Sequence, residues 1–459
     1  MTEQLKRRSM GVDLTEGPIL RSLLKFAIPI VLTNLVQQLY SMVDLMVIGW
    51  YVGTEGTVGV NAGGEIADIM TPVAICFATA GQIYIAQLFG AGNERQVKRT
   101  VGTLLGFILM ASLAVMLGII VFCRPLLHLI NCPAEAMGQA SQYMIITALG
   151  LPFIFCYNAI VGILRGIGES KKPLIFVLVA ATVNIFLDLL LVAVIPLEAA
   201  GTAIATVMSQ VGACTAAAIY LWKNRRKFDF ELKWSYFSLD RKILWTLFKL
   251  GLPQVMGVLL VRSSVIWINA QINAYGLVVS ATNSVGMKLQ KFMELFVHGV
   301  NSATAAMTGQ CLGAGKPERA AKVTKSALGV CLVCAAVSCT VCLLFPKVIY
   351  GFFTKDPEVL DMGVVFLRVM LAHVIMSSIL GPFQGLSTGC GDVNYNFIIG
   401  LLDGMASKIL LSLLFVHVFH LGYIGLFMGN SCSRIVSVSI YMVYYHSGRW
   451  RRRKLLTEA

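Results

Sequence analysis

Long apolar stretches recur along almost the whole chain, and short polar segments separate them. A helix needs roughly 20 residues to cross the 30 Å hydrocarbon core of a bilayer. Twelve stretches are long enough: 26–50, 57–84, 100–123, 138–164, 173–196, 201–222, 245–272, 280–309, 324–346, 361–387, 396–419 and 422–446. The pattern predicts an all-α integral membrane protein with twelve transmembrane helices.

The second half of the sequence repeats the first at a shift of about 223 residues. Gln87-Leu-Phe-Gly-Ala-Gly92 recurs as Gln310-Cys-Leu-Gly-Ala-Gly315, and Glu-Arg follows both. Further pairs are Gly162 with Gly385, Gly166 with Gly389, Gly168 with Gly391 and, at a shift of 224, Pro29 with Pro253. Six helices per half give both halves the same orientation, which is a parallel repeat. We therefore expect two pseudo-symmetric six-helix lobes around a substrate cavity, exposed to each side in turn.

The expected lobes are an N-lobe over 1–222 and a C-lobe over 245–459, joined by a basic cytoplasmic linker over 223–244. The composition agrees with a membrane protein: 57% of residues are hydrophobic and 13% are charged, and the mean hydropathy is +0.76. The net charge of +14 comes from Lys and Arg concentrated in the termini, the linker and the loops of one side. This bias predicts cytoplasmic termini in the inner (plasma) membrane, with no role for nucleic acid. The polar, basic opening residues predict no signal peptide.

Ionisable groups inside the membrane are functional candidates, because each costs about 3 kcal/mol on insertion scales. Asp44 shares a helical stripe with Tyr40, four residues earlier, and with Gln37, a candidate for the substrate cavity. Asp188 and Asn184 have the same i, i+4 spacing. If these faces converge, two carboxylates in a low dielectric would repel, and together they would hold a shared proton or a sodium ion. The alternative is that isolated polar residues pair between helices.

The second half lacks both acids. Position 411, the repeat partner of Asp188, is Leu411, and Asp44 maps onto Trp267 or Ile268. The repeat therefore predicts that ion coupling lies in the N-lobe. Asp403 and Lys408 in the C-lobe would form either a network of their own or a local structural pair.

Opposite charges at repeat-related positions suggest an outer gate. Glu65 and Asp68 map onto Lys288 and Lys291. Our hypothesis is that these acids and bases pair to close the gate. The alternative is local pairing, for example of Lys291 with Glu294.

The chain resembles the multidrug and toxic compound extrusion (MATE) family over nearly its whole length. The resemblance is carried by Pro29 with Tyr40 and Asp44, the Gln-x-x-Gly-Ala-Gly loops, Leu164-Arg-Gly-Ile-Gly168, Asn184-Ile-Phe-Leu-Asp188 and Ala200-Gly-Thr-Ala-Ile-Ala-Thr206. It implies efflux of amphipathic, often cationic compounds, driven by proton or sodium entry through a V-shaped pair of lobes. It also implies a cation-linked network of Tyr40, Asp44, Asn184, Asp188 and Thr206, with Asn158 as a further member. Pro29 would let the first helix bend.

We therefore expect a monomeric antiporter in the lipid bilayer that exports small organic cations, with no cofactor and no metal except a sodium ion at Asp44 and Asp188. One alternative is a flippase for lipid-linked glycans. Another is a membrane serine hydrolase, because Gly385-Leu-Ser-Thr-Gly389 matches the GxSxG pattern. The repeat partner places Leu164 where Ser387 stands, and His373 lies fourteen residues earlier, about 21 Å along a helix. The sequence therefore favours a transporter over an enzyme.

Overall fold

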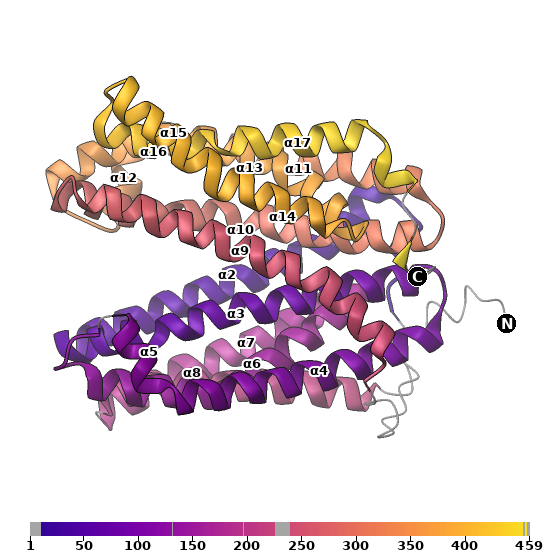
Figure 1. The fold of residues 1–459 in the computed structure, drawn as a ribbon, viewed down its shortest axis with the longest axis horizontal. Coiled ribbons are helices and arrows are strands. Elements are labelled where there is room, and N and C mark those ends of the chain that lie inside the picture. Colours follow the sequence, from indigo (N-terminus) through magenta and orange to yellow (C-terminus); the bar gives the residue numbers. More distant parts are fainter. Residues whose placement is uncertain (1–10, 131, 196, 225–238, 453–454, 457–459) are drawn as a thin grey trace. The chain divides into compact units, whose positions relative to one another are not determined.

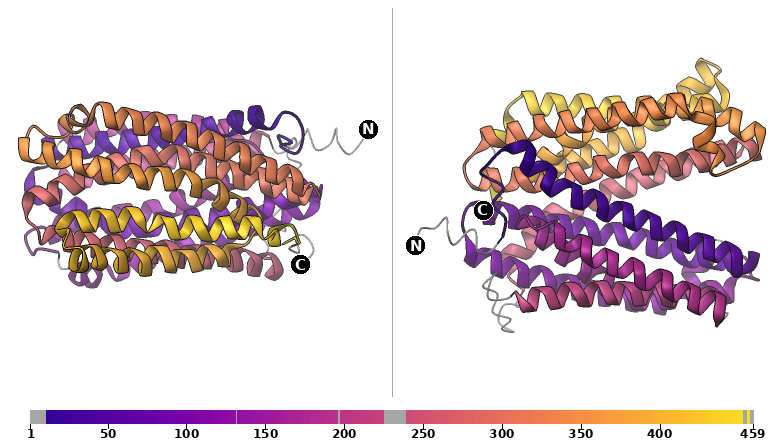
Figure 2. Two further views of the ribbon diagram at one scale, coloured as in Figure 1. Left: turned by 90° about the horizontal axis from the view of Figure 1, so that it is seen from above. Right: turned by 180° about the vertical axis from the view of Figure 1, so that it is seen from behind.

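The structure is a computed structural model of the 459-residue chain. It describes residues 11–130, 132–195, 197–224, 239–452 and 455–456, without the side chains of residues 45, 50, 53–58 and 66–68. The described chain is helical throughout, and long helices lie side by side in each of the three views (Figures 1 and 2).

Two compact units make up the chain. Unit 1 comprises residues 1–13 and 32–251, and unit 2 comprises residues 14–31 and 252–459. The helices of unit 1 are α3 (Gly53–Gly90), α4 (Glu94–Val121), α5 (Cys123–Leu129), α6 (Met137–Gly166), α7 (Lys171–Asp188), the π-helix η1 (Leu189–Val194) and α8 (Glu198–Lys223). The helices of unit 2 are α10 (Leu277–Gly313), α11 (Pro317–Leu344), α12 (Pro346–Gly351), α13 (Pro357–Gly389), α14 (Val393–Leu401), η3 (Leu402–Ser407), α15 (Lys408–Leu413), η4 (Leu414–Val418), α16 (Gly422–Cys432), α17 (Arg434–His446) and η5 (Arg449–Arg451).

Two long helices contribute residues to both units. Helix α2 (Ile19–Tyr51) belongs to unit 2 up to Val31, and helix α9 (Arg241–Asn273) belongs to unit 1 up to Gly251. The repeat-related prolines lie two residues from these divisions, Pro29 before the first and Pro253 after the second. A proline inside a helix removes a backbone hydrogen bond, so each of these helices is weakened near the point where it changes unit.

Eleven helical segments among the described residues are long and apolar enough to cross a membrane. Helix α10, with 37 residues, is long enough but too polar to be counted with them. Lys288, Lys291 and Glu294 lie within it. Together these segments correspond to the twelve predicted from the sequence, and the predicted fold class is confirmed. The short helices α5 and α12 were not predicted, because they lack the length on which the hydropathy argument depends.

The repeated glycines lie where helices of one unit pack most closely. A Cβ on Gly162 would lie 2.5 Å from the carbonyl oxygen of Ala78, and a Cβ on Gly385 would lie 2.7 Å from that of Asn301. Ala78 and Asn301 are themselves related by the 223-residue shift. Small residues allow such close backbone approach between membrane helices. The two units therefore share one packing scheme, α3 against α6 and α10 against α13.

A π-helical turn at the end of α7 has a counterpart in unit 2. Segment η1 begins directly after Asp188, and η4 lies at the repeat-related position. The backbone N–H of Leu197 donates to the carbonyl of Leu191 at 2.9 Å, and that of Leu421 donates to Phe415 at 3.0 Å. π-turns often occur at functional sites, because the extra residue changes the direction of nearby side chains.

Candidate cation site

The two acids singled out in the first half lie together in unit 1. Asp188 is the last residue of α7 and is fully buried, and Asn184, one turn earlier, is 1% exposed. Asp44 lies on α2 and is close enough to Asp188 for their charges to interact. The two acids are therefore near each other, and their role in binding an ion stays a prediction.

Most polar atoms at the centre of this cluster have no hydrogen-bond partner among the described residues. They are Oδ1 and Oδ2 of Asp188, Oδ1 and Nδ2 of Asn184, and Oδ1 of Asp44, and all are shielded from solvent. A buried polar group without a partner costs free energy, and a buried charge costs more. A bound proton or small cation would compensate these atoms, whereas a direct bond between the two carboxylates requires a proton between them.

Two further side chains, those of Gln210 and Tyr157, lie beside the predicted site and were missed in the sequence. The Tyr40 hydroxyl lies near Asp44 and within hydrogen-bonding reach of Gln210 on α8. The hydroxyl of Tyr157 on α6 is buried, has no hydrogen-bond partner among the described residues, and interacts electrostatically with Tyr40. Gln210 lies four residues after Thr206, so it shares a helix face with a residue that the family resemblance had indicated.

The remaining predicted members of the site have weaker support. Asn158 on α6 donates its amide to the carbonyl of Ile154 in its own helix at 2.8 Å. Thr202, which lies one turn before the predicted residue Thr206, donates its hydroxyl to the carbonyl of Ala199 in the same helix at 2.9 Å. Gln37 and Thr206 are half-buried. Their roles toward an ion or a substrate stay predictions.

The gate residues are described only in part. Glu65, Lys288 and Lys291 are exposed, and the side chain of Asp68 lies outside the described residues. Pairing between these acids and bases stays a prediction. The alternative partner of Lys291 is engaged elsewhere, because Glu294 contacts His373 at 2.8 Å.

Unit 2 contains its own buried charged network, which differs from the pairs considered in the sequence. Glu294 on α10 also accepts a hydrogen bond from Ser377 on α13 at 3.2 Å and lies 3.9 Å from Arg434 on α17. Arg434 pairs with Asp403 at 3.3 Å. Asp403 therefore pairs with Arg434, and no ion pair between Asp403 and Lys408 occurs among the described residues. The sequence showed these ionisable groups but not which of them meet.

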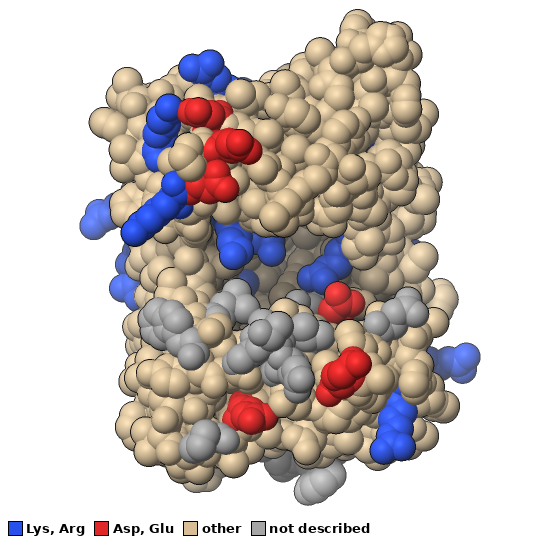
Figure 3. Space-filling model, turned by 90° about the vertical axis from the view of Figure 1, so that its left-hand side faces the viewer, with Lys and Arg blue, Asp and Glu red and all other residues tan. Residues whose placement is uncertain are grey.

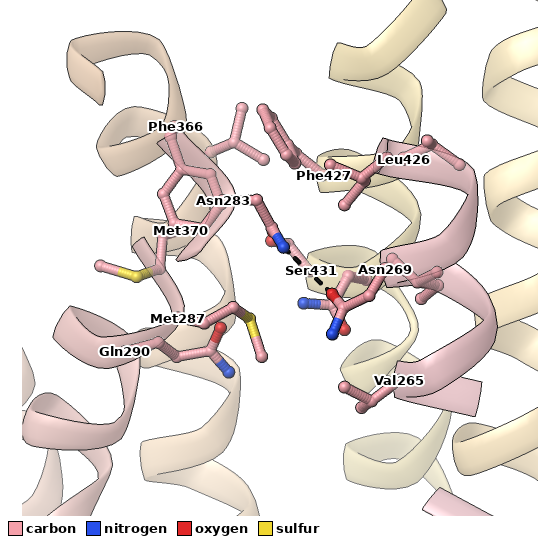
Figure 4. A pocket seen from close by; sticks show the side chains of 14 residues that line it. Val265, Asn269, Asn283, Met287, Gln290, Phe366, Met370, Leu426, Phe427 and Ser431 are labelled. Carbon is pink, nitrogen blue, oxygen red and sulfur yellow. Dashed lines mark hydrogen bonds between the residues drawn. The ribbon is translucent and has the colours of Figure 1, made fainter. Parts of the chain in front are cut away.

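A pocket in unit 2 lies between α9, α10, α13 and α16, and its lining carries no charged residue. Figure 4 shows Asn283 donating to Asn269, at 3.0 Å, beside apolar and sulfur-containing side chains. Gln290, which also lines the pocket, connects it to the network through His373 at 2.8 Å. The acids at Asp44 and Asp188 thus have no counterpart in the lining of this pocket.

The serine of the GxSxG pattern has no catalytic neighbour in the described part of the chain. Ser387 donates to the backbone carbonyl of Asp392 at 3.2 Å, and His373 is bound to Glu294 and Gln290. The glycines on either side, Gly385 and Gly389, serve helix packing. This arrangement fits a packing element and not a nucleophile.

Comparison with known proteins identifies the same repeat. The family model described as MatE matches residues 29–190 and again residues 253–414. The chain is 24% identical to "Probable multidrug resistance protein YoeA" of Bacillus subtilis, over 95% of each protein. It is 22% identical to "Multidrug export protein MepA" of Staphylococcus aureus, over 87% of this chain and 88% of that protein.

Among solved structures, the chain matches "Outward-facing conformation of a multidrug resistance MATE family transporter of the MOP superfamily" with a TM-score of 0.91. The identity is 20%, and 98% of this chain and 99% of the other are covered. At this identity the match shows the fold.

Proposed function

The chain belongs to the MATE family of multidrug efflux transporters, and on that premise we propose that it exports amphipathic organic compounds, organic cations among them, in exchange for a proton or a sodium ion. It is a multi-pass membrane transporter and not an enzyme. The proposal places it in the inner membrane with both termini in the cytoplasm, because the Lys and Arg residues concentrate in the termini, the linker and the loops of one side.

The observation that carries the proposal is a pair of carboxylates in unit 1, of which Oδ1 of Asp44 and both oxygens of Asp188 are buried without a hydrogen-bond partner among the described residues. In the part of the chain that the structure describes, the side-chain oxygen of Asn184 likewise has no hydrogen bond, and Asp44 lies close to Asp188. The site is therefore unfavourable when empty and ionised, and it becomes favourable when a cation enters. A proton would turn one carboxyl group into a donor to the other, and a sodium ion would take the carboxylate and amide oxygens as ligands.

Loading of the site is linked to the cargo through α2. Asp44 and Pro29 lie on this helix, fifteen residues apart, and the helix changes unit two residues after Pro29. Neutralising Asp44 removes its repulsion from Asp188 and lets the outer half of α2 pack differently in unit 1. A bend at Pro29 would pass this change to the cargo path, so that ion entry and cargo release alternate.

The test is ion-driven dye movement in proteoliposomes, with a pH gradient and a sodium gradient imposed separately. Ethidium, a fluorescent organic cation, is the cargo. We expect one of the two gradients to drive wild-type transport, and we expect Asp44→Asn and Asp188→Asn to reduce transport to the leak rate. Glu135→Gln, which removes an exposed acid from unit 1, is the matched control and should transport normally. Full transport by either Asn variant would refute the proposed site.

A further inference from the structure

The segment that leads into α2 is bound by side chains around the turn that joins α10 to α11 in unit 2. The backbone N–H of Leu14 donates to Oε1 of Gln310 at 3.0 Å. Arg319 donates from Nε to the carbonyl of Leu14 at 3.3 Å and from Nη2 to the carbonyl of Glu16 at 2.7 Å. Peptide groups on both sides of one short segment are therefore held by two side chains, which come from the end of α10 and the start of α11.

The same turn adds weaker contacts. Lys316 donates to the carbonyl of Thr15 at 3.4 Å and lies 3.9 Å from the carboxylate of Glu16. Both side chains of this ion pair are 44% exposed. Lys and Arg side chains also lie beside acids on the face drawn in Figure 3, and ion pairs on a protein surface generally add little stability. The attachment of the segment therefore depends mainly on the hydrogen bonds of Gln310 and Arg319.

The bound segment is shielded from solvent. Leu14 and Thr15 are 3% and 4% exposed, and Gln310 is fully buried. Leu14 belongs to an apolar cluster with Phe26 and Ile30 of α2, which residues of α10 and α11 complete. A buried N–H without an acceptor costs free energy, so the bond to Gln310 favours one position of the segment over others.

The two ends of α2 belong to different units. Residues 14–31 are part of unit 2 and lie in the sequence between two stretches of unit 1. Near the other end of α2, Val47 and Ile48 belong to an apolar cluster with residues of α6, η1 and α8 in unit 1. Pro29 lies in the part of the helix that belongs to unit 2, and Asp44 lies in the part that belongs to unit 1. A displacement that begins at Asp44 therefore reaches unit 2 along α2.

Apolar packing alone does not fix how far a helix shifts or turns. Hydrophobic contacts are non-directional, and inside a membrane the lipid tails offer a helix equally apolar partners. Hydrogen bonds, in contrast, require a narrow range of distances and angles. The bonds from Gln310 and Arg319 therefore keep the start of α2 from sliding or rotating. A displacement that begins at Asp44 is then taken up at Pro29, where the helix lacks a backbone hydrogen bond.

We propose that Gln310 and Arg319 are positioning residues that anchor the start of α2 to unit 2. Cation loading at Asp44 then bends the helix at Pro29 and does not shift it as a whole. The inference rests on the transport function above and adds the fixed point that the bend requires. It also gives a role to the second Gln-x-x-Gly-Ala-Gly motif, which Gln310 opens and Arg319 follows, and which the cation site does not use.

Hydrogen exchange of the full-length purified protein, measured by mass spectrometry, tests the anchor without measuring transport. Exchange is compared with and without sodium chloride, and at low and high pH after correction for the intrinsic exchange rate. In the wild type, the ion that drives transport should change exchange in residues 32–51 of α2 and leave residues 14–28 unchanged. In Gln310→Leu/Arg319→Ala the change should extend to residues 14–28, and Leu14 should exchange about tenfold faster.

Transport in proteoliposomes is the second measurement. Gln310→Leu/Arg319→Ala should lower ion-driven ethidium transport about tenfold per folded molecule. The ion concentration that half-saturates the rise in melting temperature should stay within about twofold of wild type. Arg319→Lys keeps one charged donor and should transport within about threefold of wild type. Normal transport by the double variant would show that the anchor serves folding alone, and loss of ion binding together with transport would place its effect at the cation site; either result overturns the inference.

The matched control is Thr308→Val/Lys322→Ala, on the same two helices. Oγ1 of Thr308 is buried without a hydrogen-bond partner among the described residues, and Lys322 is an exposed base on α11. This control should leave the ion-dependent exchange of residues 14–28 and ethidium transport as in the wild type.

Failure of the transport function would look different from failure of the anchor. If sodium and pH gradients drive no ethidium and neither ion changes exchange anywhere in α2, the proposed function fails, and the inference fails with it. If a gradient drives ethidium in the wild type but the ion-dependent change in exchange includes residues 14–28, the transport function stands and the anchor is wrong.

Discussion

The two units have the same helix packing but treat buried charge in opposite ways. In unit 1, Asp44 and Asp188 lie together and the oxygens of Asp188 have no partner among the described residues. In unit 2, Glu294 and Asp403 are held by His373 and Arg434. A charge that is already paired has little need of an ion, whereas an unpaired one needs it. The comparison supports the proposal that the cation is exchanged in unit 1, where the buried acids lie together, and not in unit 2, where each acid has a basic partner.

The largest expected effect is a loss of stability when a paired acid of unit 2 is neutralised, compared with an acid of unit 1. Asp403→Asn should lower the free energy of unfolding by about 3 kcal/mol, because it removes the closer of the two acids that face Arg434 and leaves only Glu294, at 3.9 Å. Asp188→Asn, which removes a charge without a partner, should leave stability unchanged or raise it. Apparent melting temperatures of the detergent-purified proteins, measured by intrinsic fluorescence, provide the comparison. A larger loss for Asp188→Asn than for Asp403→Asn would show that the contrast between the units is wrong.

The membrane spans, the two repeated halves and the buried acids of unit 1 could be predicted from the sequence, because each follows from a physical constraint. Apolar length and the 223-residue repeat predict the spans and the two halves, because bilayer thickness and helix rise fix the length of a span. Asp44 and Asp188 were identified because a carboxylate inside a membrane is costly. Gln210 and Tyr157 were missed, because burying an uncharged amide or hydroxyl costs less than burying a charge, and such residues therefore stand out less in an apolar stretch.

The sequence could not predict which ionisable residues of unit 2 form ion pairs with one another. Glu294, His373 and Arg434 come from α10, α13 and α17, and only the relative rotation of these helices decides that they meet. The exposure of Arg262 and Arg368 likewise depends on helix rotation. Spacing along one helix predicts which residues share a face, but it does not predict what that face contacts.

A smaller loss of stability should be equal in the two units, because both pack a repeated glycine against a neighbouring helix backbone. Gly162→Ala and Gly385→Ala each place a Cβ within 2.7 Å of a backbone carbonyl oxygen. Overpacking of this kind should cost about 1–3 kcal/mol in each unit. Gly118→Ala on α4, where a Cβ meets nothing within 4 Å, is the matched control and should stabilise the helix slightly. Melting temperatures measured as above should fall for the first two variants, and a fall in only one would show that the shared packing is unequal.

The smallest expected effects come from changing one tyrosine in each unit to phenylalanine. These two variants distinguish a residue that acts on the ion from one that only stabilises the fold. The hydroxyl of Tyr157 in unit 1 has no hydrogen-bond partner among the described residues, whereas that of Tyr441 in unit 2 donates to Asn396. Tyr441→Phe should therefore cost about 1 kcal/mol of stability and leave ion dependence unchanged. Tyr157→Phe should cost no stability, but it should shift the concentration of the driving ion at half-maximal ethidium transport by about two- to fivefold, because a polar group beside Tyr40 and the ion site is lost. If both variants lose stability equally and keep the same ion dependence, Tyr157 is a structural residue and the ion site is confined to the side chains around the two aspartates.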